Sequence, residues 1–130
     1  KVVKDTAIAK SIIKAWTCEG PEPIPPPDKA GTTAYFLKDL EKFKARGGKV
    51  ILIRFPSSGG LLQFENEVFS RENFWEEIVE AADVPAYHFE DYEQINQFYC
   101  PEWSHLSAQD ASTFTTELTR ILIKDQVINN

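Results

Sequence analysis

A carboxylate stands three residues before a histidine in the segment Cys100–Ser107, which reads CPEWSHLS. A histidine beside an acid can take a proton from a serine hydroxyl near neutral pH, because the acid fixes the ring's tautomer and stabilises the imidazolium that forms. Glu102 and His105 are therefore a candidate acid–base pair, with His105 as the general base. A helix should open directly afterwards, since Ser107 is followed three residues later by Asp110, as in a capping box.

The same segment also has a purely structural interpretation. A single histidine in a loop is more often a surface or capping residue than a catalyst, and Ser104 and Ser107 are expected to help start the helix rather than to act as nucleophiles. No serine in the chain stands out as one that His105 could activate.

Further polar candidates lie in or next to the predicted strands. Arg54 lies near the end of an apolar run, where a buried guanidinium needs a carboxylate partner or a substrate; an internal ion pair is favoured over a substrate anchor. Ser57 and Ser58 precede two glycines and are expected to form a polar turn, because the spaced glycines and lysine of a phosphate loop are missing. Arg54, Ser57 and Ser58 nevertheless remain candidate substrate-binding residues. His88 falls inside a strand and is expected to be packed and hydrogen-bonded.

Composition narrows the class of protein. The 130 residues are 42% hydrophobic and 26% charged, which is typical of one globular domain with a modest core. The net charge of -6 argues against nucleic-acid binding, and no apolar run approaches the roughly 20 residues that span a bilayer. Two histidines without ligand spacing do not indicate a metal site, and Cys18 and Cys100 could pair or stay free.

The first third of the chain predicts two helices separated by a proline-rich connection. Apolar residues recur at helical spacing from Asp5 to Trp16, whereas residues 17–31 contain five prolines and cannot propagate a helix. A second helix is expected from Thr33 to Arg46, with one apolar face, ending at Gly47–Gly48. Residues 1–32 thus form a helix plus a connection, and residues 33–130 form an α/β portion.

The rest of the chain alternates strand and helix. Lys49–Phe55 is almost continuously apolar and β-branched, which is typical of a parallel strand buried on both faces. After a variable stretch around residues 61–69, Ser70 is a plausible N-cap of a third helix, and Val84–Phe89 reads as a second strand parallel to the first. Sites in such sheets form at the carboxyl ends of the strands, here the loops 56–63 and 90–106.

Two strands are too few for the wide sheet that Lys49–Phe55 requires. Other strands must come from a partner chain or from an amino-terminal part of the protein that is not in this sequence. The second explanation is favoured, so residues 1–130 are expected to be a single α/β domain or a fragment of one.

Three segments together resemble the carboxyl-terminal half of the SGNH (GDSL-type) hydrolases: Val50–Pro56, Phe89–Tyr92 and Cys100–Leu106 with its closing helix. The similarity extends over about residues 33–124 and is greatest to the bacterial branch that modifies cell-envelope and exopolysaccharide acyl groups. It implies a flavodoxin-like three-layer parallel sheet, incomplete in this chain, in which His105 is the base and Glu102 the acid of a Ser-His-acid triad.

The resemblance also implies what this chain lacks. The family usually has aspartate where Glu102 stands, and the nucleophile-bearing segment and the oxyanion-hole residues have no counterparts here. The chain would be the carboxyl-terminal portion of an esterase or acyltransferase, inactive alone, needing no metal or organic cofactor. Its partners would be the amino-terminal remainder of the protein and an ester or acylated-saccharide substrate, in the bacterial cell envelope or secreted. The alternative is a non-catalytic α/β module that self-associates or binds a protein partner through its open sheet edge.

Overall fold

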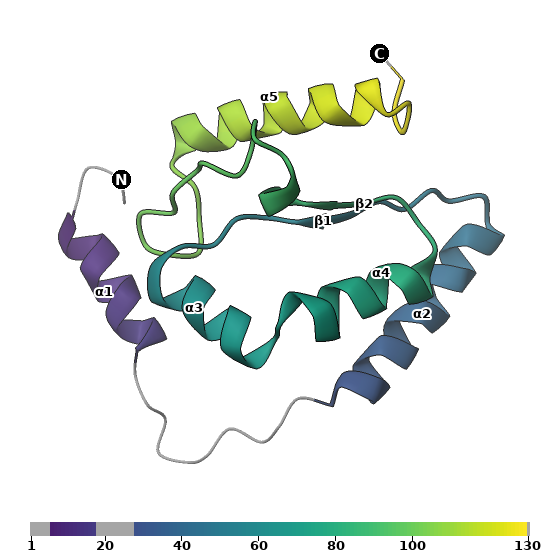
Figure 1. The fold of residues 1–130 in the computed structure, drawn as a ribbon, viewed down its shortest axis with the longest axis horizontal. Coiled ribbons are helices and arrows are strands. Elements are labelled where there is room, and N and C mark those ends of the chain that lie inside the picture. Colours follow the sequence, from purple (N-terminus) through teal and green to yellow (C-terminus); the bar gives the residue numbers. More distant parts are fainter. Residues whose placement is uncertain (1–5, 18–27, 130) are drawn as a thin grey trace.

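The chain is a mixed α/β protein with a small two-stranded sheet (Figure 1). The computed structural model describes residues 6–17 and 28–129. Within that part of the chain the elements are α1 (Thr6–Trp16), α2 (Lys29–Ala45), β1 (Leu52–Arg54), α3 (Gly59–Val68), a π-helical turn (Glu72–Glu76), α4 (Glu77–Ala82), β2 (Ala86–His88), a 3-10 turn (Phe89–Asp91) and α5 (Ala108–Lys124).

β1 and β2 pair in parallel, as the strand–helix–strand order predicts. Leu52 faces Ala86 and Arg54 faces His88 across the pair, and the amide of Leu52 donates to the carbonyl of Pro85 at 2.9 Å. Both strands are shorter than predicted. Pairing ends at His88 because the chain turns into the 3-10 turn immediately afterwards.

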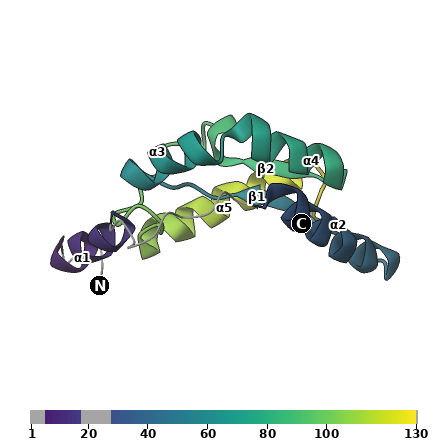
Figure 2. The same ribbon diagram turned by 90° about the horizontal axis from the view of Figure 1, so that it is seen from below.

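Helices cover both faces of the sheet (Figures 1 and 2). α5 lies on one side, whereas α3 and α4 lie on the other, with α2 against α4. α5 contributes four buried residues at helical spacing, which is the amphipathic pattern expected of it. The core cluster combines them with residues from β2 and the loop that follows: Tyr87, Phe89, Ile95, Phe114, Leu118, Ile121 and Leu122.

Local signals place several helix ends correctly. Ser107 caps α5 by accepting a hydrogen bond from the amide of Asp110 at 3.0 Å, as predicted. Gly47, with φ of +80°, terminates α2, as the Gly-Gly pair indicated. α2 nevertheless begins at Lys29 rather than Thr33, because Asp28 caps the helix by accepting from the amide of Gly31 at 2.9 Å.

Three other expectations need correction. The variable stretch after residue 60 is the helix α3, which none of the capping or periodicity signals identified. β1 is half-buried throughout rather than buried on both faces, because a sheet of two strands leaves one of its edges without a neighbour. The apolar faces of α1 and α2 are also more open than expected, and Trp16 is 50% exposed and Phe43 44% exposed.

The proline-rich connection falls outside the described residues except for Thr17 and residues 28–31, and Cys18 also falls outside them. In the part of the chain that the structure describes, no helix is both long and apolar enough to cross a membrane.

Candidate functional site

Glu102 and His105 lie at the carboxyl end of the sheet, on a loop that contacts the residues directly after β1. The two side chains differ sharply in exposure: the carboxylate of Glu102 is 3% exposed and the imidazole of His105 is 83% exposed. A buried acid bonded to an exposed imidazole suits a general base, because the ring can reach a reacting group while the carboxylate is shielded from water.

Nδ1 of His105 lies within hydrogen-bond distance of Glu102 and Ser104, which are also bonded to each other. Oε1 of Glu102 lies 2.8 Å from Nδ1, and Oγ of Ser104 lies 2.7 Å from it. Ser104 also donates to Oε2 of Glu102 at 2.6 Å, so each carboxylate oxygen has a partner. The side chain of glutamate thus reaches the imidazole at hydrogen-bond distance, despite its extra methylene relative to aspartate.

The protonation states follow from these contacts. Burial raises the pKa of the Glu102 carboxyl, but the hydrogen bonds from Ser104 and His105 outweigh it and hold the pKa below its usual value. An ionised carboxylate only accepts hydrogen bonds, so Nδ1 of His105 must carry the proton that faces it. Nε2 then holds a lone pair on the exposed side of the ring, where it can act as a base.

Ser104 was expected to help start the helix, and its direct contact with the acid–base pair was missed. The only signal for this role is its position between Glu102 and His105, which does not by itself indicate the direction of its side chain. Ser107 does cap the helix, and its hydroxyl also donates to the carboxylate of Asp110 at 2.7 Å.

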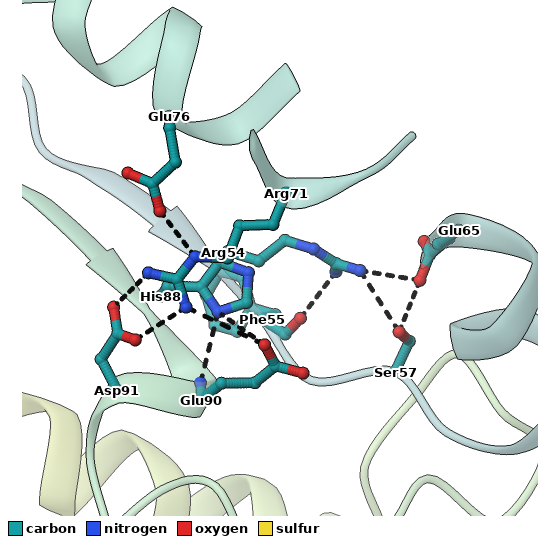
Figure 3. A network of polar contacts seen from close by, with 9 residues as sticks. All are labelled: Arg54, Phe55, Ser57, Glu65, Arg71, Glu76, His88, Glu90 and Asp91. Atoms are coloured by element: carbon teal, nitrogen blue, oxygen red, sulfur yellow. Dashed lines mark hydrogen bonds and ion pairs between the residues drawn. The ribbon is translucent and has the colours of Figure 1, made fainter. Parts of the chain in front are cut away.

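The other sequence-predicted site residues separate into two groups. Ser58, which is buried, accepts a hydrogen bond from the amide of Cys100 at 2.9 Å and so belongs to the support of the Glu102–His105 loop. Arg54 and Ser57 instead turn to Glu65 on α3, at 2.7 and 2.5 Å (Figure 3). The structure therefore contains the internal ion pair that the position of Arg54 favoured.

A second polar cluster lies beside Arg54 at the same end of the sheet (Figure 3). Arg71 donates to both oxygens of Asp91 at 2.7 Å and to Glu76 at 2.6 Å. The hydrogen bond from Arg71 lowers the pKa of the Asp91 carboxyl. His88 is buried, as expected; its burial and the nearby Arg71 lower its pKa, and its Nδ1 accepts from the amide of Glu90 at 3.3 Å.

This cluster lines a pocket of about 290 Å³ together with apolar side chains of α3 and α4. Both Arg71 and the neighbouring Arg54 form ion pairs with acids of the same chain, and Arg54 also donates to the carbonyl of Phe55 at 2.7 Å (Figure 3). The polar side chains here are therefore mostly paired with one another. Sequence reasoning missed Glu65 and Arg71 because their partners are 11 and 20 residues away.

Two mainly apolar hollows adjoin His105. One, of about 290 Å³, lies between the end of β1 and the first turns of α5, lined by Phe55, Leu106 and Phe114. The other, of about 250 Å³, lies against α1 and is lined by Ile12 and Trp16. The imidazole stands between them, so a bound molecule with an apolar group could reach it from either side.

Among the described residues no three His, Cys, Asp or Glu side chains are grouped so that they could hold a metal ion. Comparisons of the chain with protein-family models, with curated proteins and with solved structures find no match.

Proposed function

We propose that this chain is the carboxyl-terminal portion of an SGNH-like esterase or O-acyltransferase with a flavodoxin-like fold. It supplies the base His105 and the acid Glu102 of a triad whose serine belongs to the amino-terminal remainder of the protein. The substrate is an ester or an acylated saccharide, and the reaction uses no metal or organic cofactor.

The observation that carries the proposal is the geometry at His105. A buried, ionised carboxylate bonds to Nδ1 at 2.8 Å while the ring is 83% exposed. A histidine that only lay on the surface or capped the helix would not need a buried, ionised carboxylate at its Nδ1. The sheet of the described residues adds support, because a parallel sheet with helices on both faces normally has more than two strands.

In the proposed mechanism Nε2 of His105 takes the proton of the serine hydroxyl as its oxygen attacks the carbonyl carbon of the ester. Glu102 stabilises the imidazolium that forms. His105 then returns the proton to the departing alcohol, which leaves an acyl-serine. Water or a sugar hydroxyl next gives its proton to His105 and attacks the acyl-serine, and the regained proton restores the serine.

The test is an ester-hydrolysis assay on the longest natural form of the protein with p-nitrophenyl acetate. His105→Ala should reduce kcat by at least about 10³-fold, and Glu102→Gln by a comparable factor, because the wrong tautomer of the base is then favoured. Gln109→Ala, an exposed position on α5, is the matched control and should leave turnover unchanged. Undiminished turnover in the His105→Ala variant contradicts the assigned role.

The second candidate function is a non-catalytic module that self-associates or binds a protein through its open sheet edge. The observation in its favour is that, among the described residues, β1 has a strand neighbour on one edge only and is followed by Phe55, which is 53% exposed. Sedimentation velocity of the 130-residue chain over a range of concentrations tests it. A dimer that forms as concentration rises, combined with no esterase activity in the longest natural form, would support this function over the first.

A further inference from the structure

Residues 56–58 and 100–103, which are far apart in the sequence, are joined by hydrogen bonds at the carboxyl end of the sheet. The amide of Cys100 donates to Oγ of Ser58, and the amide of Ser58 donates to the carbonyl of Trp103, both at 2.9 Å. The thiol of Cys100 also donates to the carbonyl of Pro56 at 3.4 Å. Ser58 and Cys100 are both buried, so this connection is shielded from water. The loop that carries Glu102 and His105 is therefore held in place by the segment that follows β1.

Trp103, which lies between Glu102 and Ser104, has an uncommon backbone conformation. Its φ is +78°, a left-handed value that costs a bulky residue free energy and persists only where the surroundings impose it. This angle sets the direction in which the chain leaves Glu102. A rotation to negative φ would carry Ser104 and His105 away from the buried carboxylate.

The indole of Trp103 packs against Gly59 and Gly60, which leave room for it, while the amide of Ser58 bonds to the carbonyl of Trp103. A Cβ on Gly59 would lie 2.2 Å from Nε1 of the Trp103 indole, and one on Gly60 would lie 2.9 Å from two of its ring carbons. Neither glycine could carry a side chain unless the ring moved. The Gly-Gly pair, which superficially suggests a phosphate cradle, is thus occupied by an indole.

We infer that Ser58, Gly59 and Gly60 are positioning residues for His105. They hold Trp103 in its left-handed conformation, and that conformation brings the carboxylate of Glu102 to Nδ1 of the imidazole. Ser58 fixes both ends of the turn, at Cys100 and at Trp103, while the glycines accommodate the indole. The inference rests on the proposed function, since it assigns these residues to the positioning of its general base.

The tautomer of His105 provides a readout that a merely structural role would not change. Long-range ¹H–¹⁵N spectra of the 130-residue chain, recorded over a range of pH, distinguish protonation at Nδ1 from protonation at Nε2. The unmodified chain should give the Nδ1-protonated form. Ser58→Ala removes the acceptor for the Cys100 amide and should shift His105 to a mixture of both tautomers.

Ser57→Ala is the matched control, because Ser57 is equally buried but bonds to Glu65 instead of the His105 loop. Ser57→Ala should leave the tautomer of His105 unchanged. Ser58→Thr keeps the hydroxyl and should therefore give the same Nδ1-protonated form as the unmodified chain. Backbone amide signals of Phe114 and Leu118 in α5 check that each variant is folded. A folded Ser58→Ala variant that retains the Nδ1-protonated form overturns the inference.

A second pair of variants remains informative if Ser58→Ala does not fold. Gly60→Ala should shift the tautomer as long as Trp103 is present, and should have no such effect in a Trp103→Gly background, where no indole is displaced. Equal effects in both backgrounds would overturn the role of the glycine. These spectra need no nucleophile, so they can fail or succeed independently of the ester-hydrolysis assay with His105→Ala.

In the longest natural form the positioning role also predicts a kinetic pattern. Ser58→Ala should lower kcat by about 10- to 100-fold with little change in KM, because a small misplacement of the base affects the chemical step. A fall confined to KM would instead place Ser58 in substrate binding and overturn its positioning role.

Discussion

Replacement of Glu102 by glutamine tests how strongly the buried carboxylate stabilises the site. Glutamine keeps the size of the side chain but has an NH2 group in place of one carboxylate oxygen, and because Ser104 and His105 bond to different oxygens, one of them loses its acceptor. The loss of one hydrogen bond to a charged group corresponds to about 1.5–3 kcal/mol. We therefore expect Glu102→Gln to lower the free energy of unfolding of the 130-residue chain by about that amount near neutral pH.

The pH dependence of this effect has a definite sign. The folded-state pKa of Glu102 lies below its usual value, so the stabilisation is fully present above the unfolded-state pKa and is lost as pH falls through the folded-state pKa. The difference between the unmodified chain and Glu102→Gln should therefore be largest near neutral pH and become smaller as the solution is acidified below about pH 4.

Urea unfolding followed by circular dichroism at several pH values measures both quantities. Glu117→Gln is the matched control, because Glu117 pairs with the exposed Arg120 on the surface of α5 and should change the unfolding free energy by less than about 1 kcal/mol. A loss at Glu102 no greater than that at Glu117, or one that does not vary with pH, would refute the account of the buried carboxylate.

Three further outcomes are expected of the 130-residue chain. Ser107→Ala should cost about 1 kcal/mol in urea unfolding, because it removes the cap of α5; an unchanged midpoint would mean that the helix does not depend on that cap. Phe114→Ala should cost about 3–5 kcal/mol in the same assay, because Phe114 is 2% exposed and its ring contacts those of Phe55 and Phe98. Thr115→Ala, at the exposed neighbouring position, should cost far less, and a similar cost at both positions would contradict the burial of Phe114. Burial raises the pKa of the Cys100 thiol, so in a Cys18→Ser background a thiol reagent should label Cys100 slowly in the native protein and rapidly in urea; fast native labelling would contradict its burial.

Local sequence signals predicted much of the fold. The Ser107–Asp110 pair and the spacing of apolar residues after it identified α5, and Gly47 marked the end of α2. The order of strand, helix and strand predicted the parallel pair. These features depend on contacts between residues close in sequence or on chain connectivity, and such contacts can be read without a tertiary structure.

Other features depended on what lies nearby in space. The helix α3 was missed because its apolar residues, including the exposed Phe64, do not form a stripe that the core buries. The length of β1 was overestimated because a strand extends only as far as it is paired, and its partner β2 turns away directly after His88.

The sequence by itself determined the candidate pair Glu102 and His105, because three-residue spacing before a capped helix is a local pattern. Only the tertiary structure decided that Glu102 is buried, that the imidazole is open, and that Ser58 supports the loop. Ser58 and Cys100 are 42 residues apart, and the Trp103 indole fits over Gly59 and Gly60 only after the chain has folded. The physical reason is that burial and side-chain direction are set by all the elements that meet at the sheet's carboxyl end, and no single segment of sequence contains them.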